Sequence, residues 1–288
     1  MNLTPPRVPY LESAAEPVTG APVLLGVPFD GTACFRKGAA LGPDSIREAS
    51  DCLESYSPSL CRDLSLRPFS DLGNLTLAGA SAEKINILVE EASHYLLSKE
   101  LTPLLLGGEH SFTPGAVAAV LKHHPNLAVI QFDAHADLRN EWSGTRWSHA
   151  CCMRRIRDMI SPSRILQCGI RSGSSMEFDD LRESGCLVPP DVDSLGSALK
   201  KVEGLPLYLT LDLDFLDPAD LPGTGTPEPG GINWQELEEL LAAIPWHRVV
   251  ACDVVELAPE LDPTGRSSIL AAKIIREILL SLPQPPAD

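Results

Sequence analysis

Residues 127–137 read LAVIQFDAHAD, and this stretch decides the fold. Its apolar beginning, Leu127 to Ile130, predicts a strand buried inside a sheet. Asp133, His135 and Asp137 follow at intervals of two, and side chains two residues apart in extended backbone point the same way. The spacing therefore predicts that carboxylate and imidazole groups project together from the end of a buried strand.

A second stretch repeats this pattern. Residues 207–214 read LYLTLDLD, which places Asp212 and Asp214 on one face of another predicted strand. Carboxylates crowded at the ends of buried strands repel each other and raise each other's pKa values. A bound cation removes this penalty. The two stretches together predict a metal site that carries the chemistry of the protein.

The composition indicates a soluble globular protein. The chain has 288 residues, 44% of them hydrophobic, and no apolar run approaches the ~20 residues that span a bilayer. A net charge of −16 disfavours nucleic acid and anionic membranes as partners and is compatible with a cationic substrate. The N-terminus has no secretory-signal pattern, and the eight cysteines form no CxxC pair, so we expect reduced thiols in a cytoplasmic protein.

The order of predicted elements indicates an α/β fold. Apolar strands, about eight in number, alternate with amphipathic helices, which is typical of a parallel sheet with helices on both faces. The long loops follow strands, and sheets of this class bind ligands at the carboxyl ends of their strands. We expect residues 21–288 to form a single catalytic domain. Residues 1–20, which are rich in proline, are expected to form an arm that crosses the surface or touches a neighbouring subunit.

Six residues at three predicted strand ends are candidate metal ligands: His110, Asp133, His135, Asp137, Asp212 and Asp214. A lone Asp at such a position is usually a helix N-cap, but six His and Asp residues together favour metal binding. Carboxylates with imidazoles suit Mn²⁺, with Fe²⁺, Co²⁺ and Ni²⁺ as alternatives. Six ligands are too many for one tetrahedral ion, and they suit two ions ~3.5–4 Å apart that share bridging carboxylates.

Several ordered motifs resemble those of the ureohydrolase family, which includes arginase and agmatinase. The motifs are GGEH (107–110), DAHAD (133–137), LDLDFLDP (211–218), GTGTPEPGG (223–231), DVVELAP (253–259) and GAALGPDSIR (38–47). The resemblance extends over residues 23–280. It implies a three-layer α/β/α sandwich around a parallel eight-stranded sheet, two Mn²⁺ ions per subunit, and a homo-oligomer, either a trimer or a hexamer.

The resemblance also implies a role for each site residue. The first ion would be held by His110, Asp133, Asp137 and Asp212, and the second by Asp133, His135, Asp212 and Asp214. The ions would activate water for attack on a guanidinium carbon, which releases urea and an amine. His149 matches the proton-relay histidine of the family, and Glu256 matches the glutamate that pairs with the guanidinium group. The alternatives are a solvent-facing helix start for His149 and a surface charge for Glu256.

Two further features of the sequence concern Asp253 and two departures from the family pattern. Asp253 either orients a ligand or anchors a loop. The chain also departs from the family pattern at Ala150, where many members have Gly, and at Ala40, where many have Arg. Neither position is a candidate ligand, so the departures concern loop details.

The loop before His149 resembles the agmatinase branch, and Arg139 stands where arginases carry Asn. We therefore predict hydrolysis of agmatine to putrescine and urea. The alternatives are N1-aminopropylagmatine, guanidinobutyrate, formiminoglutamate or arginine as substrate, and a metal-binding pseudoenzyme, although no site residue is lost. Arg139 and Arg146 either hold a substrate carboxylate or pair with surface acids. Trp142 and Trp147 either wall the channel or pack against a neighbouring loop.

Overall fold

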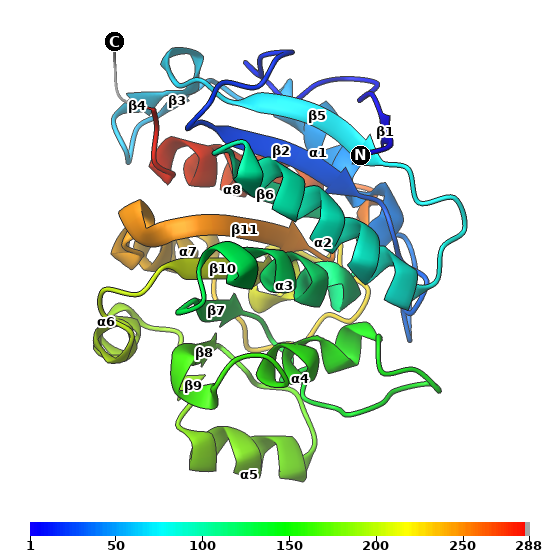
Figure 1. Ribbon diagram of the computed structural model, residues 1–288, viewed down its shortest axis with the longest axis vertical. Helices are drawn as coiled ribbons and strands as arrows, with labels where there is room; N and C mark the ends of the chain where they lie inside the picture. The colour runs from blue at the N-terminus through cyan, green and yellow to red at the C-terminus, as the bar shows by residue number, and fades with distance from the viewer. Residues whose placement is uncertain (286–288) are drawn as a thin grey trace.

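A nine-stranded sheet forms the centre of the computed structural model, which describes residues 1–285 (Figure 1). The strand order is β1-β5-β2-β6-β11-β10-β7-β8-β9, and all pairings are parallel except that of β1 with β5. The strands are β1 (Leu3–Thr4), β2 (Pro22–Val27), β5 (Ser70–Leu75), β6 (Thr102–Gly107), β7 (Ala128–Phe132), β8 (Ile165–Cys168), β9 (Leu187–Val188), β10 (Leu207–Asp212) and β11 (Val249–Val255). The predicted parallel sheet is confirmed. Residues 286–288 of the expected domain lie outside the described residues.

Helices cover both faces of this sheet. One face carries α1 (Gly42–Ser50), α6 (Val192–Lys201), α7 (Trp234–Ala243) and α8 (Arg266–Ser281). The other carries α2 (Ala82–Ser98), α3 (Thr113–His123), α4 (Cys152–Arg157) and α5 (Ser175–Ser184). The strands alternate accordingly, because Leu104 and Leu106 belong to the first core and Leu105 to the second. The result is the expected three-layer sandwich.

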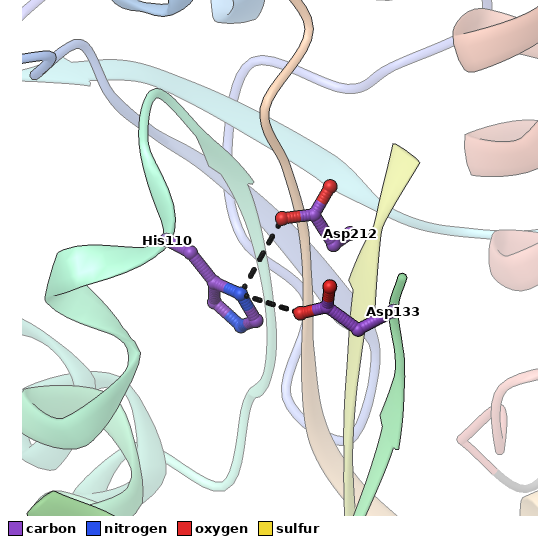
Figure 2. A group of neighbouring side chains, drawn as sticks. All are labelled: His110, Asp133 and Asp212. Carbon is purple, nitrogen blue, oxygen red and sulfur yellow. Dashed lines mark ion pairs between the residues drawn. The ribbon is translucent and has the colours of Figure 1, made fainter. Parts of the chain in front are cut away.

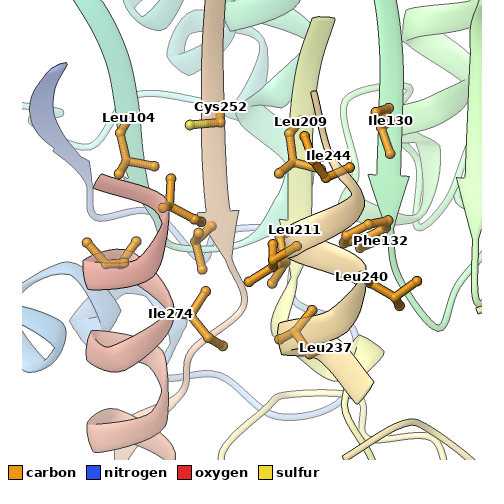
Figure 3. Close-up of a cluster of buried hydrophobic side chains, with 14 of the residues drawn as sticks. Leu104, Ile130, Phe132, Leu209, Leu211, Leu237, Leu240, Ile244, Cys252 and Ile274 are labelled. Carbon is orange, nitrogen blue, oxygen red and sulfur yellow. The ribbon is translucent and has the colours of Figure 1, made fainter. Parts of the chain in front are cut away.

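The central strands are apolar on both sides because both of their faces are covered. Leu209 and Leu211 of β10 point toward Leu237 and Leu240 of α7, which form one wall of the core (Figure 3). All four side chains are almost completely buried. Truncation of a leucine in such a position typically destabilises a protein by roughly 2–5 kcal/mol. This core fixes the strand ends from which the functional residues project.

The N-terminal arm crosses the surface of its own chain, which is one of its two predicted courses. Leu3 and Thr4 form β1, which pairs with Leu75 and Asn74 and so covers the edge that β5 would otherwise expose. Tyr10 is buried, and its hydroxyl donates to the carbonyl oxygen of Ala272 in α8 (2.6 Å). The arm therefore packs on the sheet and helices of its own chain. A short hairpin of β3 (Tyr56–Ser57) and β4 (Arg62–Asp63) went unpredicted.

Strands β6, β11, β10 and β7 are neighbours in the middle of the sheet although they are far apart in the sequence. Because they are parallel, their carboxyl ends meet at one edge of the sheet. Among the described residues, none of the helices has the length and apolar character needed to cross a membrane.

Candidate metal centre and active-site pocket

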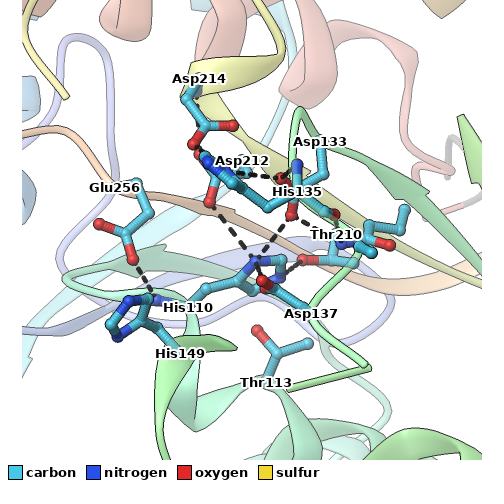
Figure 4. Close-up of polar contacts among 12 residues, drawn as sticks. His110, Thr113, Asp133, His135, Asp137, His149, Thr210, Asp212, Asp214 and Glu256 are labelled. Atoms are coloured by element: carbon cyan, nitrogen blue, oxygen red, sulfur yellow. Dashed lines mark hydrogen bonds and ion pairs between the residues drawn. The ribbon is translucent and has the colours of Figure 1, made fainter. Parts of the chain in front are cut away.

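The candidate metal ligands and Glu256 lie at the carboxyl ends of the four central strands, whereas His149 follows the long loop after β7. His110 comes after β6, the group from Asp133 to Asp137 after β7, Asp212 and Asp214 at the end of β10, and Glu256 directly after β11. Figure 4 shows these side chains converging on one cluster. The sheet topology thus brings together residues that are separated by up to about half of the chain.

Of the carboxylates, only Asp212 lies on an extended strand as the spacing predicted, because the backbone turns directly after β7 and β10. Strand β7 ends at Phe132, and β10 gives way to a 3₁₀ turn at Leu213–Phe215. Asp133 Oδ1 accepts a hydrogen bond from the backbone N–H of His135 (2.6 Å), and Asp212 Oδ1 accepts one from Asp214 (2.9 Å). An Asp side chain that binds the backbone two residues later forms such a turn by itself. The two turns explain why the ligand types converge despite the early end of each strand.

Two overlapping groups of side chains are arranged to hold ions. Nδ1 of His110 lies 3.1 Å from Asp133 Oδ2 and 3.4 Å from Asp212 Oδ2 (Figure 2). In the second group, His135 Nδ1 lies 2.8 Å from Asp214 Oδ2 and 3.7 Å from Asp133 Oδ1. Within each group the candidate ligand atoms lie within 4.8 Å of one another. Asp133 belongs to both groups, as a bridging ligand must.

Asp137 also belongs near the first group, with its Oδ2 atom 3.3 Å from His110 Nδ1. Its φ is 53°, in the left-handed region that an Asp tolerates better than most residues do. Backbone strain of this kind is concentrated at functional sites. Glu256, with φ 69°, is the other strained residue of the site.

The ring orientation of His110 fits a metal ligand. Its Nε2 atom lies 2.8 Å from Thr210 Oγ1, and Thr210 donates its own hydroxyl hydrogen to Asp253 Oδ1 (2.5 Å). Thr210 therefore accepts from Nε2–H, which leaves a lone pair on Nδ1 of the neutral ring. Nδ1 is buried and has no hydrogen-bond partner among the described residues. A lone pair directed at three carboxylates is repelled unless a cation lies between them.

The electrostatics of the cluster lead to the same conclusion. Burial raises the pKa of Asp133 to about 7, and the neighbouring charges of Asp214 and Asp137 add to the effect. Burial and the Asp214 charge also raise the pKa of Asp212. Burial lowers the pKa of His135, but the Asp214 carboxylate outweighs it and raises that pKa to about 11. Among the described residues, no lysine or arginine pairs with these four aspartates, whose basic neighbours are the rings of His110 and His135, so the residues fit divalent cations.

A polar row beneath the cluster was largely missed from the sequence. Gln167, Gln131, Thr210 and Asp253 lie in register on β8, β7, β10 and β11. Gln131 donates to Asp133 Oδ2 (2.6 Å) and accepts from Gln167 (2.7 Å). Asp253 accepts a hydrogen bond from Thr210, which in turn accepts one from His110. Of the two roles considered for Asp253, these contacts favour the orientation of a candidate ligand. A usable signal was present, because Gln167, Gln131 and Asp253 are each the single polar position within an apolar strand.

A pocket opens over the cluster. Its lining includes, besides the cluster, the residues Cys34, Arg139, Trp142, His149, Ala150, Thr226 and Glu256. Sequence reasoning did not identify Cys34 or Thr226, because both belong to long loops whose path depends on the rest of the fold.

Glu256 places a buried carboxylate in the wall of the pocket. The residue is buried, and its Oε1 accepts a hydrogen bond from the backbone N–H of His110 (2.8 Å). Burial, with the charge of Glu109 as the next contribution, raises the pKa of Glu256 to about 8. A planar guanidinium in the pocket would favour the ionised form and donate two parallel hydrogen bonds to the carboxylate oxygens.

His149 begins a 3₁₀ turn (His149–Cys151) directly ahead of α4. Its ring faces the pocket, and Nε2 lies 3.3 Å from the thiol sulfur of Cys34. Burial lowers the pKa of the ring, which keeps it neutral near pH 7. The half-buried ring thus lines the pocket, which favours the pocket-facing interpretation over the solvent-facing one.

The two arginines of the preceding loop have different surroundings. The Arg139 guanidinium lies 4.3 Å from the Trp142 ring centroid and 4.0 Å from a Glu177 carboxylate oxygen, at the pocket wall. Arg146 pairs with Asp158 (3.4 Å) outside this pocket. Trp142 thus walls the pocket, whereas Trp147 and Arg146 line a separate groove beside α2 and α4.

The comparisons with known proteins agree with this geometry. The model of the Arginase family matches residues 21–281, and the chain belongs to this family; it is a ureohydrolase that acts on linear amidines. The agmatinase of Bacillus anthracis is 41% identical over 90% of both chains. The N(1)-aminopropylagmatine ureohydrolase of Thermococcus kodakarensis is 37% identical over 90% of both chains. The crystal structure of a putative agmatinase from Clostridium difficile superimposes with a TM-score of 0.87 at 37% identity, covering 92% of this chain and 97% of that one.

Proposed function

We propose that this protein hydrolyses agmatine to putrescine and urea with two Mn²⁺ ions per subunit. The observation that carries the proposal is the pair of His/Asp groups that share Asp133 at the floor of a pocket containing Glu256 and His149. The similarity to agmatinases, together with the loop around Arg139, supports agmatine over other guanidines. The assignment of each ligand is the one given by the family resemblance.

The residues of the site would have three separate roles in the reaction. Divalent ions held by the six ligands supply Lewis acidity and lower the pKa of water toward neutrality. The carboxylate of Glu256 accepts hydrogen bonds from the guanidinium nitrogens and fixes the plane of the group. His149 Nε2, which faces the pocket, takes up a proton and delivers it to the departing amine.

A substrate panel tests this proposal. Urea release is measured with Mn²⁺ for agmatine, N1-aminopropylagmatine, guanidinobutyrate, formiminoglutamate and arginine, and agmatine is expected to show the highest kcat/KM. A higher value for another compound would transfer the function to that sister activity. Urea production that survives unchanged in His135→Ala would contradict the assigned metal chemistry altogether.

One observation favours a second candidate, hydrolysis of a guanidino acid. The guanidinium of Arg139 lies at the pocket wall, and its Nη2 atom is 4.0 Å from Glu177 Oε2, which makes this a loose ion pair. A substrate carboxylate would find a cation there, whereas the ammonium group of agmatine would be repelled. In the panel, this candidate predicts that guanidinobutyrate is preferred over agmatine.

We also propose that residues 21–288 act as one catalytic domain, and that the protein is a cytoplasmic trimer or hexamer, as the family resemblance implies. Light scattering of the purified chain in Mn²⁺ buffer measures the subunit number, and a monomer would contradict it.

A further inference from the structure

A buried carboxylate, Glu109, lies next to the metal ligand His110 but points away from the cluster toward another loop. It accepts hydrogen bonds from the backbone N–H of Thr32 (2.7 Å), the hydroxyl of Thr32 (2.5 Å) and the hydroxyl of Ser111 (2.5 Å). Glu109 is completely buried and makes no ion pair among the described residues. A buried carboxylate without a cation depends on such donors, so it holds the Thr32 hydroxyl hydrogen firmly.

Thr32 also contacts His149 at two points. Its Oγ1 accepts a hydrogen bond from the backbone N–H of His149 (3.1 Å) and lies 3.2 Å from the ring atom Nδ1. The only hydrogen of this hydroxyl is already donated to Glu109. Thr32 can therefore serve His149 only as an acceptor.

This contact decides which ring nitrogen carries the proton. An unprotonated Nδ1 would place its lone pair against a lone pair of Thr32 Oγ1, whereas a protonated Nδ1 donates to it. The other neighbours impose no such choice, because the hydroxyl of Ser148 (3.4 Å from Nδ1) and the thiol of Cys34 (3.3 Å from Nε2) can each donate or accept.

We propose that Thr32, held by Glu109, is a positioning residue that keeps the proton of neutral His149 on Nδ1 and presents the Nε2 lone pair to the pocket. The role assigned to Thr32 rests on the proposed function of His149 in guanidine hydrolysis. With this tautomer, Nε2 is ready to accept a proton from a group in the pocket and to release it again. The opposite tautomer would present an N–H where an acceptor is needed, and the ring would have to flip or exchange protons first.

The position of the proton can be measured directly on the full-length chain. Two-bond ¹H–¹⁵N correlation spectra of the imidazoles, recorded with diamagnetic Mg²⁺ at about pH 8, where an ordinary imidazole is neutral, identify the tautomer of each ring. The His149→Gln spectrum assigns the resonance. We expect the Nδ1–H form in the wild-type protein, and an Nε2–H form there would overturn the proposal without any variant.

Variants then test which residue sets the tautomer. Thr32→Val keeps the shape and loses the hydroxyl, so the Nε2–H form should become populated and kcat should fall roughly tenfold, as expected for one lost hydrogen bond, with KM within about twofold. Thr32→Ser keeps the hydroxyl and should restore both the tautomer and kcat. Ser148→Ala and Cys34→Ala should leave the Nδ1–H form unchanged.

Two outcomes would assign the effect elsewhere and so contradict the proposal. The Nδ1–H form could persist in Thr32→Val, or either of the Ser148 and Cys34 variants could lose it. The spectra do not depend on turnover. If the His149 ring is in the Nδ1–H form but the protein releases no urea from any guanidine, the proposed function is contradicted. The assignment of the tautomer would still hold.

Discussion

The floor and the mouth of the pocket are built from different parts of the chain. Five of the six His and Asp residues at the ends of β6, β7 and β10 line the floor, and the sixth, Asp133, contacts His110 and His135 there. All six except His135 are buried. The mouth consists of Cys34, Arg139 and Trp142, which lie on long loops and are exposed or half-buried. The floor is tied to the sheet by hydrogen bonds to Gln131 and Thr210. Chemistry common to the family can therefore reside in the floor, while the mouth is free to select the substrate.

Removing one charge from the floor should have the largest effect. Asp212→Asn keeps the shape but loses the negative charge next to His110, so metal is bound weakly or incompletely. Because a metal supplies several kcal/mol of stabilisation to the transition state, urea release should fall roughly a thousandfold or more. Bound Mn²⁺, measured by elemental analysis, should fall below two per subunit. Asp179→Asn, on an exposed salt bridge, is the control and should change neither quantity.

The floor should also make metal binding dependent on pH. In the folded, metal-free chain the pKa of Asp133 is raised to about 7, whereas an unfolded Asp titrates near 3.9. The folded chain then binds more protons than the unfolded one, so its stability falls as the pH rises from about 4 to about 7. His135, with its pKa raised to about 11, acts in the same direction above pH ~6.5.

Metal ions must displace these protons, so Mn²⁺ should stabilise the protein more at higher pH. We expect the increase in Tm caused by Mn²⁺, relative to a chelator, to grow by several degrees between about pH 5.5 and about pH 7.5. Calorimetry at the two pH values measures it. An increase that is equal at both, or larger at the lower pH, would mean that the aspartates are ionised without metal.

Glu256 lies between floor and mouth, and its substitution should have an intermediate effect. In Glu256→Gln the amide oxygen can still accept from the His110 N–H, but the charge that pairs with a guanidinium is lost. We expect kcat/KM for agmatine to fall roughly a hundredfold, near the upper range for a hydrogen bond to a charged group. Metal content should stay at the wild-type value. Full activity in this variant would remove Glu256 from the substrate site.

A change at the mouth should alter selectivity more than rate. In Arg139→Met the cation at the pocket wall is lost, so kcat/KM for guanidinobutyrate should fall about tenfold, while that for agmatine changes less than about threefold. Arg146→Met, which lies outside the pocket, should affect neither. If agmatine turnover collapsed in Arg139→Met, the mouth would be part of the catalytic machinery and the contrast with the floor would fail.

The floor of the pocket could be predicted from the sequence better than the mouth. The floor was predictable because each ligand follows an apolar run, and apolar runs in a parallel sheet end at one edge. The structure brings these residues together, but not on extended backbone as the spacing predicted, since Asp214 lies on a 3₁₀ turn and Asp137 has a left-handed backbone. Hydrophobic periodicity describes the strand and says little about the turn that ends it.

The amino-acid pattern by itself determined the parallel α/β sandwich and the position of six candidate ligands at strand ends, because strands buried on both faces are continuous apolar runs and the end of each run is visible in the sequence. The tertiary structure alone decided that the N-terminal arm pairs with β5, that Thr210 and Asp253 orient His110, and that Thr32 meets His149 across 117 positions of the chain. Such contacts depend on the order in which strands assemble into the sheet, and no local pattern records that order.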